Sequence, residues 1–321
     1  MRRDADLAAA LRKRPRVGEM IIRYVLLFCG LVSIFTTVGI VIVNTTTAIE
    51  FFTVDEVSPI DFFTNTVWRP AAYNPDATYN PGLIPIGVLP LLYATLFTSF
   101  IALIVAVPLG LGSAIYLAEY APERVRNTLK PILEILAGIP TVVLGYFALT
   151  FMTPLLQAIP GLNVQIFNMA APGLVMGVMI IPTISSMSED AISSVPRELR
   201  EASYGLGATR FESITKVVLP AALSGLVAAF ILGLARAVGE TMIVALAAGS
   251  APADLLNNFL NPFVAGETMT GHIARITGGD LPYDSIQYRS LFAIGLTLFV
   301  STLALNLISQ WVSRRFREAY E

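Results

Sequence analysis

The chain has 321 residues, of which 55% are hydrophobic and 14% are charged, and its mean hydropathy is +0.69. This composition excludes an ordinary soluble domain, in which about 25% of residues are charged. The expected environment is therefore membrane lipid. The formal net charge is only −2, and we expect no nucleic-acid partner.

Six stretches are apolar enough to cross a membrane, given that a helix needs about 20 apolar residues to span about 30 Å of hydrocarbon. They cover residues 22–43, 89–118, 132–157, 172–187, 217–248 and 290–312. The fourth is short and contains Pro182, which favours a tilted or partly re-entrant element. Because the alternation of apolar and polar residues typical of a membrane barrel is absent, we predict an all-α integral membrane protein with six transmembrane helices.

The first stretch follows a basic segment, but it is longer than a signal-peptide core of about 7–15 residues, so we interpret it as a retained anchor. Of the 21 Lys and Arg residues, 17 fall in four places, 2–23, 124–130, 197–216 and 314–317. With six spans, these places share one side, and the positive-inside rule puts them and both termini in the cytoplasm. The predicted order is a basic segment 1–21, a first helix 22–43, an outer loop 44–88, a core 89–313 with five helices and a cytoplasmic loop 188–216, and a tail 314–321.

The predicted outer loops carry nine acidic residues against three basic ones, a balance of −6. An exterior of this sign repels anions, so an anionic solute would need a carrier to bring it to the mouth. The acidic residues are Glu50, Asp55, Glu56, Asp61, Asp76, Asp254, Glu267, Asp280 and Asp284, and the basic ones are Arg69, Arg275 and Arg289. Loop 44–88 is too aromatic for a plain disordered linker, and we expect it to pack on the outer face, either near a carrier protein or as a passive cap.

The sequence lacks the residues that nucleotide binding, disulfide formation, metal binding and catalysis require. None of the three lysines, Lys13, Lys130 and Lys216, stands in a phosphate-binding loop motif, so any ATP and its Mg²⁺ must be bound by a partner. The single cysteine, Cys29, permits no internal disulfide or zinc cluster, and we interpret it as a packing residue. The single histidine, His272, has no Cys or His partner, and we interpret it as a loop residue. We therefore predict no enzyme, no metal site and no cofactor.

Loop 188–216 contains local sequence signals for two short helices joined by a turn. Pro196 favours a short helix from Arg197, Gly205 and Gly207 end it, and Thr209 with Glu212 forms a capping box that begins a second helix. Leu206 and Phe211 are apolar residues on this polar element, and they are candidates to enter a cleft on a partner. The alternative is a solvated loop whose apolar residues lie against the membrane.

Arg236 and Glu240 lie inside the fifth apolar stretch. A charge near the bilayer centre costs about 2.5–3.5 kcal/mol on insertion scales, so such residues face the protein interior or water. At a spacing of four on one helix they would lie one above the other and compensate each other. Either they form a closed ion pair between helices, or Arg236 contacts a passing oxyanion while Glu240 holds it in place. Gly239 leaves room for close approach by a helix or ligand, and Thr241 lies next to the pair.

The twenty residues from Glu201 to Pro220 resemble the EAA loop of ABC importer permeases, matching at Glu201, Ala202, Gly207, Leu219 and Pro220. Ser203 and Val217 depart from the pattern. In that family an ATPase subunit grips this loop, which implies ATPase-coupling roles for Glu201, Ala202, Leu206, Gly207 and Phe211. The resemblance also implies the MetI-like fold of type I importer permeases.

The segment Gly233–Met242 is similar to a signature of the two membrane subunits of the bacterial phosphate-specific (Pst) ABC importer, and the likeness covers residues 19–318. The basic amino-terminal segment and the long loop 44–88 look more like the C-type subunit than its A-type sister. The resemblance implies phosphate passage at Arg236 and Glu240, with Gly239 and Thr241 beside them. It also implies a sister A-type permease, two ATPase subunits, an extracytoplasmic phosphate-binding protein, alternating access, and a place in the bacterial inner membrane.

Three alternatives remain: an ABC permease for another oxyanion such as molybdate or sulfate, an ion-driven carrier or channel working alone, and a membrane enzyme. A lone carrier would give no reason for the pattern at residues 201–220. An enzyme lacks a credible set of catalytic groups.

Overall fold

The computed structural model describes residues 17–54, 57–69, 85–279, 281–283 and 285–315. The chain divides into two compact units, Met1–Thr46 and Thr47–Glu321, each described by itself. Most of the basic segment 1–21 and of the tail 314–321 lies outside the described residues, as does part of loop 44–88.

The described residues form helices joined by turns, with one isolated β-bridge between Trp68 and Ile86. The α-helices are α2 (Val17–Phe52), α3 (Pro59–Thr64), α4 (Leu89–Ile115), α5 (Glu123–Ala137), α6 (Thr141–Phe147), α7 (Thr153–Gln157), α8 (Ala170–Ser193), α9 (Arg197–Gly205), α10 (Arg210–Ser213), α11 (Leu219–Ala221), α12 (Leu223–Val238), α13 (Met242–Ala247), α14 (Met269–Thr277) and α15 (Ile286–Arg315). Three π-helical segments join them, η2 (Tyr116–Tyr120), η3 (Ala148–Met152) and η4 (Ile214–Val218). The all-α prediction is confirmed.

The first unit is the amino-terminal part of α2. This helix is long and apolar enough to cross a membrane, and it extends beyond the predicted span 22–43 at both ends. Its large apolar side chains are exposed on every side, which suits a helix surrounded by lipid. Cys29, interpreted above as a packing residue, is exposed on this helix.

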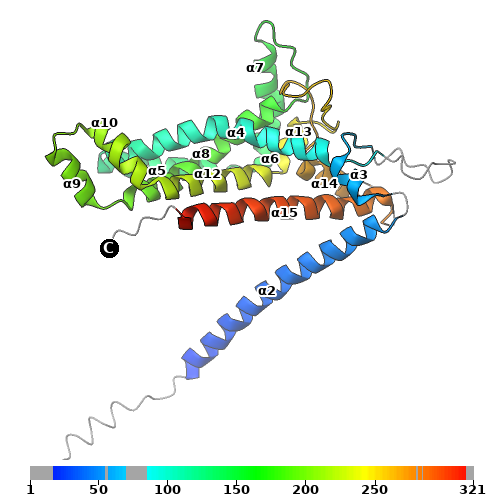
Figure 1. Cartoon of the computed structure of the whole chain (residues 1–321), viewed down its shortest axis with the longest axis horizontal. Coiled ribbons are helices and arrows are strands. Elements are labelled where there is room, and N and C mark those ends of the chain that lie inside the picture. Colours follow the sequence, from blue (N-terminus) through cyan, green and yellow to red (C-terminus); the bar gives the residue numbers. More distant parts are fainter. Residues whose placement is uncertain (1–16, 55–56, 70–84, 280, 284, 316–321) are drawn as a thin grey trace, which may run out of the picture. The chain divides into compact units, whose positions relative to one another are not determined.

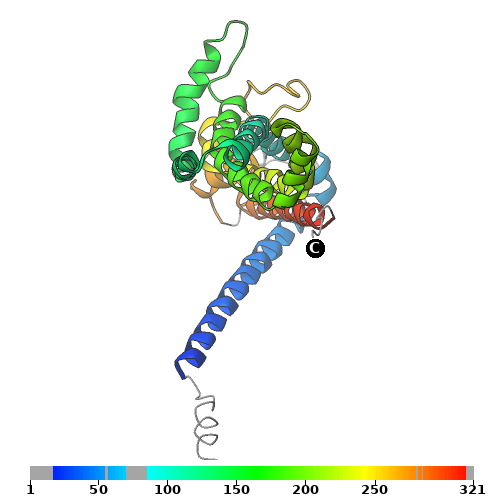
Figure 2. The same cartoon turned by 90° about the vertical axis from the view of Figure 1, so that its left-hand side faces the viewer.

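The second unit is a bundle in which α4, α8, α12 and α15 lie side by side (Figure 1), seen end-on in Figure 2. Helix α8 is the centre of the bundle and most of its residues are buried. Helices α4 and α8 approach closely at Gly177, where a Cβ atom would lie 2.8 Å from the carbonyl oxygen of Ala102. Helices α9 and α10 lie at one end of this bundle, and α3 and α14 lie towards the other (Figure 1).

Of the two forms expected for the fourth element, the partly re-entrant one is wrong, and the tilted one stays a prediction. Helix α8 runs without a break for 24 residues through Pro182 and passes the length and hydropathy test for a span. The apolar stretch 172–187 is shorter than the helix because the helix continues through polar residues that the bundle buries. Ser188 and Glu189 are both 0% exposed.

Two of the other predicted spans, the third (132–157) and the fifth (217–248), are bent in the structure. Helix α5 and the α6–α7 segment meet at 82°, and the α10–α11 segment meets α12 at 72°. The first bend falls at Gly138–Pro140 and the second directly after Pro220, where the ring removes a backbone donor. Four described helices are long and apolar enough to cross a membrane, and the count of six is reached when each bent pair is one span.

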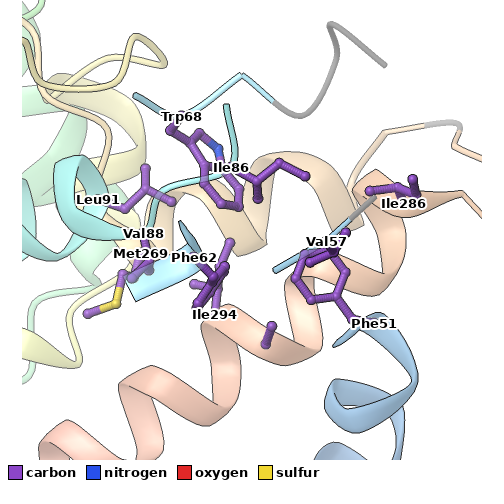
Figure 3. Close-up of a cluster of buried hydrophobic side chains, with 11 residues drawn as sticks. Phe51, Val57, Phe62, Trp68, Ile86, Val88, Leu91, Met269, Ile286 and Ile294 are labelled. Atoms are coloured by element: carbon purple, nitrogen blue, oxygen red, sulfur yellow. The ribbon is translucent and has the colours of Figure 1, made fainter. Parts of the chain in front are cut away.

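The described part of loop 44–88 packs into a hydrophobic cluster of the second unit (Figure 3). Phe62 of α3, Trp68 and Ile86 are almost fully buried there, together with Met269 of α14 and Ile294 of α15. Phe62 and Trp68 meet edge to face, with ring centroids 6.3 Å apart. The packing of this loop is confirmed for its described residues, while its relation to a carrier protein stays untested.

Candidate functional site

The first candidate site is the α9–α10 elbow, residues Arg197–Ser213. Pro196 directly precedes α9 without a side-chain capping bond, and Gly207 turns the chain with φ +86°, a backbone conformation that favours glycine. Helix α10 begins with the predicted capping box. The backbone N–H of Glu212 donates to Thr209 Oγ1 at 3.3 Å, and that of Thr209 donates to Glu212 Oε2 at 3.0 Å. The helix–turn–helix prediction is confirmed.

The elbow presents apolar side chains to solvent. Leu206 is 91% exposed and Phe211 is 68% exposed, so neither is tucked against this chain's own bundle. Glu201 and Ala202 are exposed on α9 beside them, and the Ala202 carbonyl accepts from the N–H of Leu206 at 3.1 Å. Leu206 and Phe211 thus remain available to a partner, as the prediction requires.

A buried ion pair, which sequence reasoning missed, holds the elbow to the bundle. Arg200 Nη2 lies 2.9 Å from Oε1 of Glu119 in η2, and the carboxylate is almost fully buried. The same guanidinium donates to the carbonyls of Val195 at 2.5 Å and Ile192 at 2.8 Å, at the carboxyl end of α8. Arg200 therefore ties α9 to the end of α4 and to the end of α8.

Arg210 makes the matching contact for α10. Its guanidinium donates to the backbone carbonyl of Glu119 and lies 4.8 Å from the ring centroid of Tyr120. A cavity of about 400 Å³ opens between these groups. Its lining is Ala118, Glu119, Arg126, Ser193, Arg197, Arg200, Glu201, Tyr204 and Arg210. The signal for this arrangement is the cluster of arginines that the charge count assigned to one face.

The second candidate site is Arg236, in the last turn of α12. Its side chain is exposed, and Nη1 donates a hydrogen bond of 2.7 Å to Oγ1 of Thr183 on α8. Among the described residues, no carboxylate forms an ion pair with Arg236. The partner of the guanidinium is therefore a neutral hydroxyl, at the surface of the bundle. Thr183 was not predicted, since a hydroxyl within an apolar helix carries no sequence signal of its own.

The predicted stacking of Arg236 and Glu240 on one helix face is wrong. Helix α12 ends at Val238, and Glu240 lies in the break before α13. Glu240 Oε1 accepts the backbone N–H groups of Met242 at 2.9 Å and Ile243 at 3.3 Å, which satisfies donors at the start of α13. Glu240 thus starts a helix and does not hold Arg236.

The residues around the break have modest contacts. A Cβ atom on Gly239 would meet only carbonyls of its own helix, at 3.5 Å and 3.8 Å, so no neighbouring helix approaches closely there. Thr241 is half-buried and its hydroxyl lies 3.4 Å from the Gly239 carbonyl. Thr270 of α14 donates to the Glu240 carbonyl at 2.7 Å, which connects the break to the far end of the bundle. Irregular backbone of this kind is tolerated at membrane depth only where protein or a water-filled cavity covers it.

His272 is not the loop residue that was predicted. It lies in α14, 1% exposed, with Nδ1 3.1 Å from Glu267 Oε2 and its ring edge-on to Trp68. Arg275 Nε lies 2.8 Å from the other oxygen of Glu267. This buried cluster fixes α14 against the loop that carries Trp68. Within the described part of the chain, no group of three or more His, Cys, Asp or Glu residues could hold a metal ion.

A bundle in which four described helices are long and apolar enough to cross a membrane, or six if each bent pair is one span, is typical of an integral membrane protein. Residues 106–318 match the family described as binding-protein-dependent transport system inner membrane component. The chain belongs to this family, the type I ABC importer permeases of the inner membrane.

Relatives are similar over most of the chain. A probable ABC transporter permease of Bacillus subtilis, YqgH, is 34% identical over 95% of this chain and 94% of its own length. The phosphate transport system permease protein PstC 1 of Mycobacterium tuberculosis is 33% identical over 95% of this chain and 93% of its own length. The PstC protein of Pasteurella multocida is 35% identical over 75% of this chain and 78% of its length.

Two solved structures share the fold. A chain of the MetNI methionine ABC transporter, in an inward-facing conformation, aligns with a TM-score of 0.54 and 22% identity over 72% of this chain and 96% of its own. A chain of a bacterial alginate ABC transporter, solved with its alginate-bound periplasmic protein, aligns with a TM-score of 0.60 and 18% identity over 95% and 99%. These likenesses confirm the MetI-like fold.

Proposed function

We propose that this chain is a channel-forming subunit of an ATP-driven importer that moves inorganic phosphate into the bacterial cytoplasm by alternating access. The observation that carries the proposal is Arg236, an exposed guanidinium inside an apolar segment whose partner is the neutral hydroxyl of Thr183. A guanidinium donates bidentate hydrogen bonds to oxyanions, and one without a carboxylate partner is available to a passing anion. The relatives named as phosphate permeases support phosphate as that anion.

The α9–α10 elbow is the proposed docking site for an ATPase subunit, which binds the ATP and Mg²⁺. The sequence has no phosphate-binding loop motif of its own, and Leu206 and Phe211 offer apolar surface for a cleft. The proposed complex contains this chain, a sister A-type permease, two ATPase subunits and an extracytoplasmic phosphate-binding protein. The positive-inside rule supports an orientation with both termini and the elbow in the cytoplasm.

The contacts suggest how force reaches the pathway. Closure of the ATPase subunits would move the elbow, and the Glu119–Arg200 pair would pass that movement to the ends of α4 and α8. Helix α8 carries Thr183, which contacts Arg236. A rigid-body shift of the bundle against its sister would then open the pathway to one side at a time.

The test is reconstitution of the four-component complex in liposomes, with ATP inside and the phosphate-loaded binding protein outside. We expect ATP-dependent phosphate uptake that falls at least tenfold in Arg236→Gln, because one charge-assisted hydrogen bond to an ion contributes about 1.5–3 kcal/mol. Arg236→Lys, which keeps the charge, is the matched control. Normal uptake by Arg236→Gln would remove the role of Arg236.

The same assay decides between phosphate and another oxyanion. A guanidinium suits sulfate and molybdate as well as phosphate, so uptake of all three is measured with their own binding proteins. Transport of sulfate or molybdate in place of phosphate would assign the chain to the alternative. Uptake without any ATPase subunit would make it a lone carrier. Pairing with a C-type partner would make this chain the A-type sister.

A further inference from the structure

We propose that Thr183 is a second oxyanion contact of the pathway: its oxygen positions Arg236, and its hydroxyl hydrogen is donated to the passing anion. This inference rests on the proposed function and adds a residue to its site. The first observation is the 2.7 Å bond from Arg236 Nη1 to Thr183 Oγ1, which joins two helices across 53 positions of sequence.

The second observation is the hydrogen of that hydroxyl. Hydroxyls on the neighbouring helices donate back to a carbonyl four residues earlier, as Thr95 and Ser99 do on α4 and Thr297 does on α15, at 2.7–2.8 Å. Thr183 of α8 makes no such bond in the described structure, and the same holds for the buried Ser185 and Ser188 hydroxyls of this helix, which have no partner. Thr183 differs from them because it is half-buried and its oxygen accepts from Arg236, so its hydrogen is available to an acceptor outside the chain. An oxyanion provides such an acceptor.

The third observation is the close packing that holds the two side chains in register. Gly233 lies one turn before Arg236 on α12, on the same face of the helix. A Cβ atom there would lie 3.0 Å from Cδ1 of Ile184, the neighbour of Thr183 on α8, and 3.3 Å from Ile180. Ile180 and Ile184 are fully buried, so α12 packs closely on the buried face of α8. This packing sets the position of the α12 backbone that carries Arg236, and the hydroxyl of Thr183 sets the position of its guanidinium.

The fourth observation is that the partner of Arg236 is a neutral hydroxyl and not a carboxylate. A carboxylate in the place of Thr183 would cancel the charge of Arg236 and compete with the anion. A hydroxyl fixes the guanidinium without changing its charge, and it leaves the remaining N–H groups of Arg236 free to donate. The pair thus presents only donors to the pathway. A set of donors binds any oxyanion, so we expect Thr183 to control the rate of passage and not the choice among oxyanions.

The experiment compares Thr183→Val and Thr183→Ser in the reconstituted complex with the phosphate-loaded binding protein. Valine keeps the shape and removes the hydroxyl, whereas serine keeps the hydroxyl. We expect Thr183→Val to lower the maximal uptake rate about tenfold with KM unchanged, because the carrier protein sets the apparent affinity. Thr183→Ser is expected to stay within about twofold of the wild type. The matched control is Thr297→Val, a half-buried threonine of α15 far from Arg236 in sequence, which is expected to import normally.

Two further measurements separate a pathway role from a folding role. Assembly of the complex and its ATP hydrolysis, stimulated by the loaded binding protein, should be unchanged in Thr183→Val. The double variant Thr183→Val with Arg236→Gln should lose less than the sum of the two single losses, because Thr183 has no guanidinium left to position once Arg236 is replaced. Normal uptake by Thr183→Val, an equal loss in Thr183→Ser, or additive losses in the double variant would each overturn the inference.

Failure of the proposed function has a different result. If the wild-type complex imports sulfate or molybdate and no phosphate, the phosphate assignment is wrong, and the same variants measured with that anion still decide the role of Thr183. If the wild-type complex assembles but imports no oxyanion, both proposals are overturned.

Discussion

Arg200 of α9 and Glu119 of η2 form an ion pair of 2.9 Å in which the carboxylate is almost fully buried. The two residues are 81 positions apart, and the same guanidinium also caps the last turn of α8 through the Ile192 carbonyl. One side chain thus joins the exposed elbow to two long helices of the bundle. A movement imposed on the elbow would reach α4 and α8 through this group, together with the contact of Arg210 with the Glu119 carbonyl.

Removing Arg200 should destabilise the chain more than removing the charge of Glu119. Arg200→Ala leaves a buried carboxylate without its cation, which costs about 3–5 kcal/mol, and it also leaves two carbonyls without a donor. Glu119→Gln still offers an oxygen to the guanidinium, and we expect a loss of about 1–2 kcal/mol. Thermal unfolding of the purified chain in detergent measures both.

Arg197→Ala is the control for this comparison, because Arg197 is exposed on the same helix. A surface substitution of this kind should stay within about 0.5 kcal/mol of the wild type. If Arg200→Ala unfolded at the same temperature as Arg197→Ala, the pair would contribute nothing to the attachment of the elbow.

Gly207→Ala should strain the turn between α9 and α10. Gly207 has φ +86°, where a Cβ atom costs about 1–2 kcal/mol, although the space around it is empty. Gly205 lies in the last turn of α9 without a positive φ, so Gly205→Ala should be neutral or stabilising by up to about 1 kcal/mol. Thermal unfolding together with binding of the ATPase subunit distinguishes the two variants, and equal effects would show that the turn does not depend on this conformation.

The elbow could be predicted because its signals are local. Proline, glycine and the Thr209–Glu212 capping box act over a few residues, and the structure has all three where the sequence put them. Arg236 could be identified as a candidate site residue because a charged side chain is costly within a membrane-spanning segment and usually serves a function there. The partners of Arg200 and Arg236 could not be found, since they are 81 and 53 positions away and depend on how the helices pack.

The errors have physical causes too. Glu240 was placed above Arg236 because no proline marks the end of α12, whereas the helix stops at Val238 and the carboxylate caps α13 instead. Helix α8 was taken as short because hydropathy counts its buried serines and Glu189 as polar. His272 was taken as a loop residue because its partner Glu267 and its neighbour Trp68 meet it only in the folded chain.

Leu206→Ser should weaken ATPase binding without affecting the chain's own stability. The side chain is 91% exposed, so the folded chain loses no packing when it is removed. If it enters a cleft on the ATPase subunit, its loss should lower affinity about tenfold or more, because burying a leucine contributes about 1.5–3 kcal/mol. Titration of the ATPase subunit onto the purified permease measures the affinity.

Leu256→Ser is the matched control for docking. Leu256 is 78% exposed and lies in the loop between α13 and α14, remote from the elbow in sequence. It should leave ATPase affinity unchanged. Wild-type affinity in Leu206→Ser, or an equal loss in Leu256→Ser, would contradict docking through Leu206.

Glu240→Ala and Glu240→Gln should differ, and the difference separates two roles for this carboxylate. Glu240 accepts the N–H groups of Met242 and Ile243 through one oxygen. Alanine leaves both donors without a partner at the start of α13, which should cost about 1–3 kcal/mol of stability. Glutamine retains an acceptor oxygen and should cost less than about 1 kcal/mol. An ion pair with Arg236 would predict instead that both substitutions disturb Arg236 equally, since each removes the charge.

The structure predicts further that the effects of Arg236→Gln and Glu240→Gln on the free energy of unfolding are additive, because the two side chains share no contact. A coupling energy above about 0.5 kcal/mol in that double-mutant cycle would show that the two side chains interact, and additivity would confirm that they do not.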